Sequence, residues 1–150
     1  MIIYLDVCCW NRPFDDQAQN RVRLEAEAVL SILEMADAGK LTLVGSDTID
    51  DELLRMPDGE RREKVELLLG STSKHISLTA IVERRAKELH QWNISPLDAL
   101  HLASAEAAHA DFFLSTDDYL LRRARRHEEE LKVKIENPVK WLIQKATDES

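Results

Sequence analysis

The sequence predicts an α/β protein, a three-layer α/β/α sandwich around a central, mainly parallel sheet of four to five strands. Short apolar runs rich in β-branched residues alternate with segments of helical periodicity from end to end. No internal repeat or low-complexity linker interrupts this alternation. The first apolar run also lacks the polar alternation of a half-exposed strand, which is typical of a strand covered on both faces.

Length and composition favour one compact domain over residues 1–150. A chain of 150 residues with 44% hydrophobic content suits one hydrophobic core and leaves little room for a second. The opening apolar run is broken by Asp6, unlike a signal peptide, and no stretch approaches the roughly 18 to 20 apolar residues of a membrane span. We therefore expect a soluble, cytoplasmic protein with no membrane association.

The net charge argues against a broad nucleic-acid-binding surface. The chain has 28 acidic and 20 basic residues, a formal charge of -8. Proteins that grip nucleic acid over a wide area are usually basic, so any such substrate would be bound locally. Cys8 and Cys9 are adjacent, which makes them poor disulfide partners and too few for a zinc site, and we interpret them as small core residues.

The first third of the chain reads as strand, loop, helix, strand and helix. Met1 to Leu5 is the first strand, and Asn11 to Gln19 has the turn chemistry of a loop, with Phe14 packed inward and Arg12 in solvent. Asn20 to Ala38 has helical spacing and ends before Gly39. Leu41 to Val44 is a second strand, and Ser46 or Asp47 caps a helix that runs to about Met56.

The middle of the chain continues the alternation. Glu60 to Leu69 is a charged helix with interleaved acids and bases, typical of a solvated face. Lys74 to Leu78 is a short strand, and Thr79 caps a helix whose inward positions are Val82, Ala86 and Leu89.

The last third begins with a capping box. Ser95 and Asp98 have the S-x-x-D spacing, and Pro96 stands at the first helical position. Phe112 to Ser115 is the next strand, followed by a helix capped by Thr116 or Asp117. Lys132 to Ile135 is a last short strand, and Pro138 begins a terminal helix.

Four acids stand where such a fold collects ligands. Asp6 and Asp117 directly follow strands, and ligands of open parallel sheets bind beyond the carboxyl ends of the strands. Asp98 lies in the first turn of an unusually apolar helix. Glu52 falls about 60° from Ile49 on the helical wheel, so it is aimed along the edge of the core, whereas Asp51 points away.

Each acid also has a purely structural interpretation. Asp6 can turn the chain, Asp98 can complete its capping box, Asp117 can cap a helix, and Glu52 can be a partly exposed flank residue. His101 and His109 lack the spacing of a metal-ligand pair, and we interpret them as hydrogen-bonded packing residues. The clustered arginines near residues 122–126 are explained by the helix dipole and by balance from Glu128 to Glu130.

Five segments together resemble the PIN domain, a nuclease family common among bacterial and archaeal toxins of the VapC type. The resemblance covers nearly the whole chain, and its two middle motifs after the first strand are the most specific. One departure is Val7, where the family usually has Thr or Ser after the first Asp. The segments are IIYLDVCCWN, SDTIDDEL, SPLDALHLASAE, FFLSTDDYLLRRA and ENPVKWL.

The resemblance implies a metal-dependent endoribonuclease that leaves a 5′-phosphate and a 3′-hydroxyl. It implies that Asp6, Asp98 and Asp117 bind Mg²⁺ or Mn²⁺ and that Glu52 is a further ligand or orients the water. These hard cations prefer oxygen ligands, and several carboxylates do not stay ionised side by side without a cation.

Secondary candidates and partners follow from the same resemblance. Ser115 is a supporting group, and Asp118 is the second choice to Asp117, because the register of S-T-D-D can slip by one. The substrate implied is RNA, and the toxin members of the family imply an antitoxin protein and a homodimer as partners. The alternative is a catalytically inactive PIN-like binding or scaffold module, favoured by Val7 and by the acidic charge.

Overall fold

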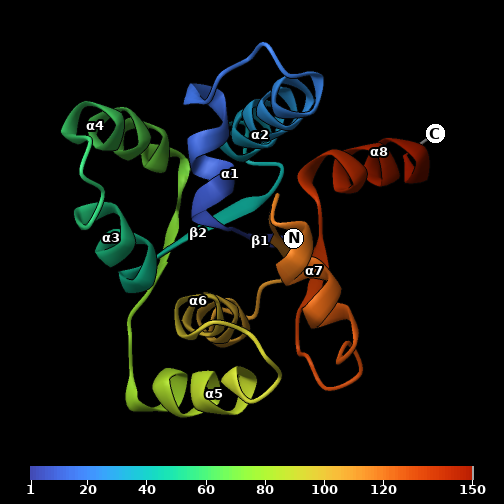
Figure 1. The fold of residues 1–150 in the computed structure, drawn as a ribbon. Helices are drawn as coiled ribbons and strands as arrows, with labels where there is room; N and C mark the ends of the chain where they lie inside the picture. The colour runs from blue at the N-terminus through green and yellow to red at the C-terminus, as the bar shows by residue number, and fades with distance from the viewer. Residues whose placement is uncertain (150) are drawn as a thin grey trace.

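The computed structural model describes residues 1–149 and contains one sheet of parallel strands in the order β3-β2-β1-β4-β5 (Figure 1). All four neighbouring pairs are parallel, which confirms the predicted fold class. The strands are β1 (Ile2–Leu5), β2 (Thr42–Ser46), β3 (Lys74–Ile76), β4 (Phe112–Leu114) and β5 (Lys134–Glu136).

Helices cover both faces of this sheet, with α1 and α2 on one side and α5 and α6 on the other (Figure 1). Among the described residues, no helix is long and apolar enough to cross a membrane. The helices are α1 (Val7–Asn11), α2 (Asn20–Asp37), α3 (Asp47–Leu54), α4 (Gly59–Leu68), α5 (Ala80–His90), α6 (Pro96–Ala107), α7 (Asp118–Arg125) and α8 (Pro138–Asp148), and the short 3₁₀ turns are η1 (Arg12–Phe14) and η2 (Leu69–Ser71).

The core is built around β1, the central strand. Ile3, Tyr4 and Leu5 are completely buried, because each side chain meets a helical layer on one face of the sheet or the other. The ring of Tyr4 stacks on Phe113 of β4 with 5.6 Å between centroids. The apolar run at the start of the sequence therefore forms the middle of the molecule.

Several element boundaries differ from the sequence-based prediction. Helix α1 was not predicted, because its five residues are too few to display helical periodicity. Strand β5 lies two residues later at its start than predicted, and α3 ends two residues earlier, at Leu54. The predicted loop from Asn11 to Gln19 is otherwise irregular, apart from the turn η1.

The strand order creates a crevice between β1 and β4. From β1 the chain continues to β2 on one side, and β4 later pairs on the other side, so the direction of winding reverses at β1. Such a reversal opens a ligand crevice at the carboxyl ends of the strands. The register pairs Leu5 with Leu114, and Asp6 N–H donates to the Leu114 carbonyl at 2.9 Å. Asp6 and Ser115 consequently lie side by side at this crevice.

Candidate active site

Asp6 is held in one position at the end of β1. It is 6% exposed, and its two carboxylate oxygens accept separate hydrogen bonds. Oδ1 accepts from the Val7 N–H at 2.9 Å, and Oδ2 accepts from the Ser115 hydroxyl at 2.8 Å. The first bond makes Asp6 the N-cap of α1. Its structural and chemical roles are therefore compatible, since Oδ1 retains a further lone pair.

The serine that follows β4 supplies a hydroxyl to the first acid. Val7 has no hydroxyl to offer, and its side chain is buried in the core. Ser115 is itself fully buried and donates to Asp6 from the neighbouring strand. The departure at Val7 therefore does not leave the Asp6 carboxylate without a hydroxyl donor.

Cys8 lies beside the same carboxylate, which the sequence did not indicate. Its sulfur is 3.5 Å from Asp6 Oδ2 and 3.4 Å from the Ser115 hydroxyl. Cys9 is a buried core residue, as interpreted from the sequence, but Cys8 is only half-buried. The cause is α1, which turns the side chain of its second residue back over the end of β1.

Asp117 is linked to Asp6 through Ser115. The Asp117 N–H donates to the Ser115 hydroxyl oxygen at 3.1 Å. Asp117 is the N-cap of α7, and its Oδ1 accepts from the Leu120 N–H at 3.1 Å. Ser115 thus orders two acids that follow different strands.

Asp98 reaches the same region from the first turn of α6. The Ser95 hydroxyl accepts from the Asp98 N–H at 3.2 Å, so Ser95 is the N-cap of α6, which is the first of the two bonds of the predicted capping box. Partial burial and then the negative charge of Asp6 raise the Asp98 pKa to about 6, while Asp117 adds to the same effect. An acid whose neighbours are acids is poorly balanced by the protein alone.

Glu52 is oriented by a chain of buried polar side chains. Its Oε1 is 2.8 Å from His101 Nε2, and His101 Nδ1 is 2.7 Å from the Tyr4 hydroxyl. That hydroxyl is in turn 2.7 Å from the hydroxyl of Ser46, which caps α3. His101 and Ser46 are completely buried, so the chain fixes the direction in which Glu52 projects from α3.

One proton arrangement satisfies every member of this chain. The Glu52 carboxylate can only accept, so Nε2 of His101 carries a hydrogen, and Nδ1 of a neutral imidazole then accepts from Tyr4. Burial raises the Tyr4 pKa well above its usual value, which keeps the phenol protonated as a donor. Glu52 Oε2 has no hydrogen-bond partner within residues 1–149 and remains available.

Asp118 points away from this group. Both of its oxygens accept from Arg21, at 2.8 and 2.7 Å, and this guanidinium lowers the Asp118 pKa. Arg21 also donates to the Thr116 carbonyl at 3.1 Å, which braces the loop before α7. Of the two neighbouring acids, Asp117 is therefore the one ordered beside Ser115.

The loop before α7 is braced further by a buried carboxylate, Glu25, which the sequence did not lead us to expect. Glu25 is 1% exposed and binds Arg12 at 2.9 Å, Arg21 at 3.2 Å and the Asn137 amide at 2.7 Å. Its position three residues after Val22 on the inward face of α2 was the available signal. Arg12, interpreted as a solvated loop residue, is instead held by Glu25 and Asp15.

His109 corrects a second interpretation. We interpreted it as a packing residue, but it is exposed and has a φ of 56° just after α6. A left-handed residue at this position ends the helix, and the side chain consequently faces solvent. His101 does behave as a hydrogen-bonded buried residue.

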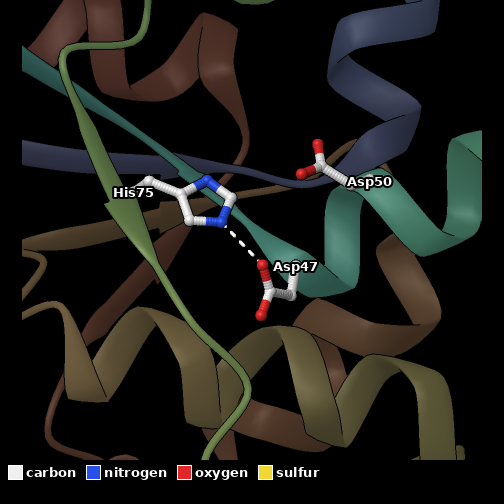
Figure 2. A group of neighbouring side chains, drawn as sticks. All are labelled: Asp47, Asp50 and His75. Carbon is white, nitrogen blue, oxygen red and sulfur yellow. Dashed lines mark hydrogen bonds and ion pairs between the residues drawn. The ribbon is translucent and has the colours of Figure 1, made fainter.

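A separate group of possible metal ligands lies near β3. Figure 2 shows Asp47 and Asp50 on α3 facing His75 on β3. Within the described part of the chain, this is the group of three whose ligand atoms all lie within 4.8 Å of one another. Asp47 binds His75 Nε2 at 2.7 Å and the Leu78 N–H at 2.8 Å, which ties β3 to α3. These internal partners account for the positions of Asp47 and His75 without a cation.

The chemistry of Asp6, Asp98 and Asp117 fits a hard divalent cation. The donors are carboxylate oxygens, and the Asp98 pKa is raised by burial and by the negative charges of Asp6 and Asp117, which His101 offsets only in part. Like charges hold carboxylates apart, and a cation between them would draw them together. The residues present can therefore hold Mg²⁺ or Mn²⁺ as well as order each other.

Comparison with known proteins identifies the family and the fold. The model of the PIN domain family matches residues 3–126. The structure of Rickettsia felis VapBC2 bound to a DNA fragment from its promoter has a TM-score of 0.59 at 18% identity, covering 91% of this chain and 98% of that chain. VapBC-1 from nontypeable Haemophilus influenzae has a TM-score of 0.57 at 17% identity, covering 92% and 98%. Comparison with curated protein sequences finds no match.

Proposed function

This chain belongs to the PIN domain family, and from that premise we propose that it is a metal-dependent endoribonuclease. We propose that residues 1–150 form one such domain and that RNA phosphodiester bonds are its substrate. Asp6, Asp98 and Asp117 are the proposed ligands of Mg²⁺ or Mn²⁺. Glu52 is proposed as a further ligand or as the residue that orients the attacking water.

One observation carries this proposal. Three acids from three elements lie near one another at the crevice between β1 and β4, and burial, followed by the negative charges of Asp6 and Asp117, raises the Asp98 pKa to about 6. A purely structural acid pairs with a base, as Glu25 and Asp118 do in this molecule. Perturbed carboxylates that lack such a partner and lie in a crevice are typical of a functional site.

The chain's own residues supply binding and orientation. The hydrogen bonds from Val7 and Ser115 hold the Asp6 carboxylate, and the bond from the Leu120 N–H holds that of Asp117, so the protein itself orients two of the proposed ligands. A bound divalent cation acidifies water and offsets charge on the phosphate. Glu52, held by His101, can accept a hydrogen bond from that water through Oε2.

Cleavage of RNA by the purified protein tests the proposal. We expect cleavage with Mg²⁺ or Mn²⁺, none with EDTA, and none for Asp98→Asn with either metal. The matched control is Asp51→Asn, because Asp51 is an exposed acid paired with Arg55 on the outer side of α3. If the metal-loaded protein is inert and calorimetry detects no divalent cation binding, the chain is instead an inactive binding module.

We further propose that the protein is the toxin of a toxin-antitoxin pair with an antitoxin protein as its partner. The support is the likeness of its fold to two structures of VapBC complexes. Expression of the wild-type chain alone should slow growth, and Asp6→Asn should relieve the defect. Equal growth of cells expressing the wild type and Asp6→Asn, at equal protein levels, would refute the toxin role.

A further inference from the structure

A basic groove adjoins the candidate site. It lies between α2, α7 and α8 and encloses about 590 Å³. Four basic side chains from these three helices line it, although the protein as a whole has a charge of -8. They are Arg21, Arg122, Arg125 and Lys140.

Two of these cations are not matched by an acid of their own. Arg21 binds Glu25 and Asp118, and Arg125 binds Glu136 rather than the acids at 128–130 expected from the sequence. Arg122 and Lys140 are exposed and form no ion pair within residues 1–149.

The unmatched cations gather around one carboxylate. Arg122 and Lys140 line the groove together with Asp118, which already has Arg21 as its partner. The lining also contains Glu25 and Glu136, so its four basic residues stand against three acids and leave an excess of one positive charge. This excess of positive charge can bind a further anion, because all four basic side chains are exposed to solvent.

The groove lies beside the loop that carries Asp117, although none of the four proposed site acids lines it. Asp118 lines the groove and directly follows Asp117, and Arg21 donates to the carbonyl of Thr116 in the same loop. An RNA strand whose phosphate lies at the acids must continue beyond them on one side. The groove is the neighbouring surface where positive charge offsets the negative charge of the protein.

We propose that the groove formed by Arg21, Arg122, Arg125 and Lys140 binds the sugar-phosphate backbone of the RNA substrate next to the cleavage site. The inference rests on the proposed function and adds the path of the substrate to it. Arg122 and Lys140 are the principal phosphate contacts, since Arg21 and Arg125 are already engaged by acids. Contacts of this kind raise affinity without reading sequence.

A charge-matched pair of double variants tests this path. Arg122→Gln/Lys140→Gln removes two positive charges from the groove. Arg84→Gln/Lys132→Gln removes two from a larger cavity of about 1120 Å³ beside α5, whose lining contains no residue of the loop at 115–118. Both double variants are made in an Asp98→Asn background. Fluorescence anisotropy then measures binding of a short labelled RNA in Mg²⁺ over a series of salt concentrations.

We expect the groove variant to bind RNA about tenfold more weakly than its parent. The slope of the logarithm of the binding constant against the logarithm of the salt concentration should fall in magnitude by about 1 to 1.5, since each contact to a phosphate of a single strand contributes about 0.7. The cavity variant should bind like the parent. Equal RNA binding by both variants would overturn the proposal. A groove variant that loses affinity for an acidic peptide but keeps its affinity for RNA would also overturn it. Wild-type cleavage is measured separately: binding through the groove without cleavage would refute the nuclease and keep the groove.

Discussion

Asp98→Asn should stabilise the metal-free protein at neutral pH while it abolishes cleavage. In the folded chain the Asp98 pKa is raised to about 6 from an ordinary value of 3.8. That difference corresponds to at most about 3 kcal/mol of destabilisation at neutral pH. Partial solvent exposure reduces it to about 1–2 kcal/mol, and loss of a negative charge near the start of α6 costs about 0.5 kcal/mol. The expected net gain is about 1 kcal/mol.

The stability that Asp98→Asn gains over the wild type depends on pH. Because the folded state holds the Asp98 proton more tightly, the wild type binds more protons when folded and loses stability as the pH rises from about 4 to about 6. The variant has no such loss. The gain should therefore be present at pH 7.5 and absent at pH 3.5.

Urea unfolding in EDTA measures the free energy at both pH values. A gain of about 1 kcal/mol corresponds to a rise of about 2–4 °C in the melting temperature of a chain of this size. Mg²⁺ at ten times its dissociation constant should then make the wild type more stable than the variant, because it binds only the wild type and stabilises it by about 1.4 kcal/mol. A variant less stable than the wild type in EDTA at pH 7.5, with Asp51→Asn unchanged, would refute the electrostatic reasoning.

Three further predictions follow from the hydrogen bonds around the site. His101→Phe should lower the free energy of unfolding in urea by about 2–3 kcal/mol, because it leaves the buried partners of His101 unsatisfied. Glu52→Gln should lower cleavage with little loss of stability. Equal losses of stability in the two variants would contradict this prediction. Glu25→Gln should cost about 2–4 kcal/mol by the same measurement, because two arginines lose a buried partner, and a cost below about 1 kcal/mol would disprove its bracing role. Asp117→Asn should abolish cleavage and Asp118→Asn should retain most of it, and the reverse result in a cleavage assay would move the ligand by one residue.

Much of the fold was accessible from local patterns. The continuous apolar run before Asp6 and the capping box at Ser95 each have a single physical interpretation, and the structure has the strand and the helix that they predict. Helix α1 was not predicted, because so short a helix shows no periodic pattern of apolar residues. Strand β5 shifted because three residues at the sheet edge are selected by pairing with β4, which local sequence does not encode.

The site was less accessible because it depends on contacts between distant segments. The sequence could place Asp6 after a strand, but it could not show that Ser115, on another strand, donates to it. The orientation of Glu52 depends on His101, which is distant in the chain, and the burial of Glu25 depends on Asn137 in the last third. The helical wheel indicated only that Glu52 lies near the core edge.

Anomalous scattering from a crystal grown with Mn²⁺ tests the central claim most directly. The proposed nuclease centre predicts a peak coordinated by Asp6, Asp98 and Asp117, with Glu52 directed toward it. That peak should vanish in Asp98→Asn crystals grown with the same ion. A peak found only among Asp47, Asp50 and His75, or no peak at the crevice at saturating Mn²⁺, would contradict the account.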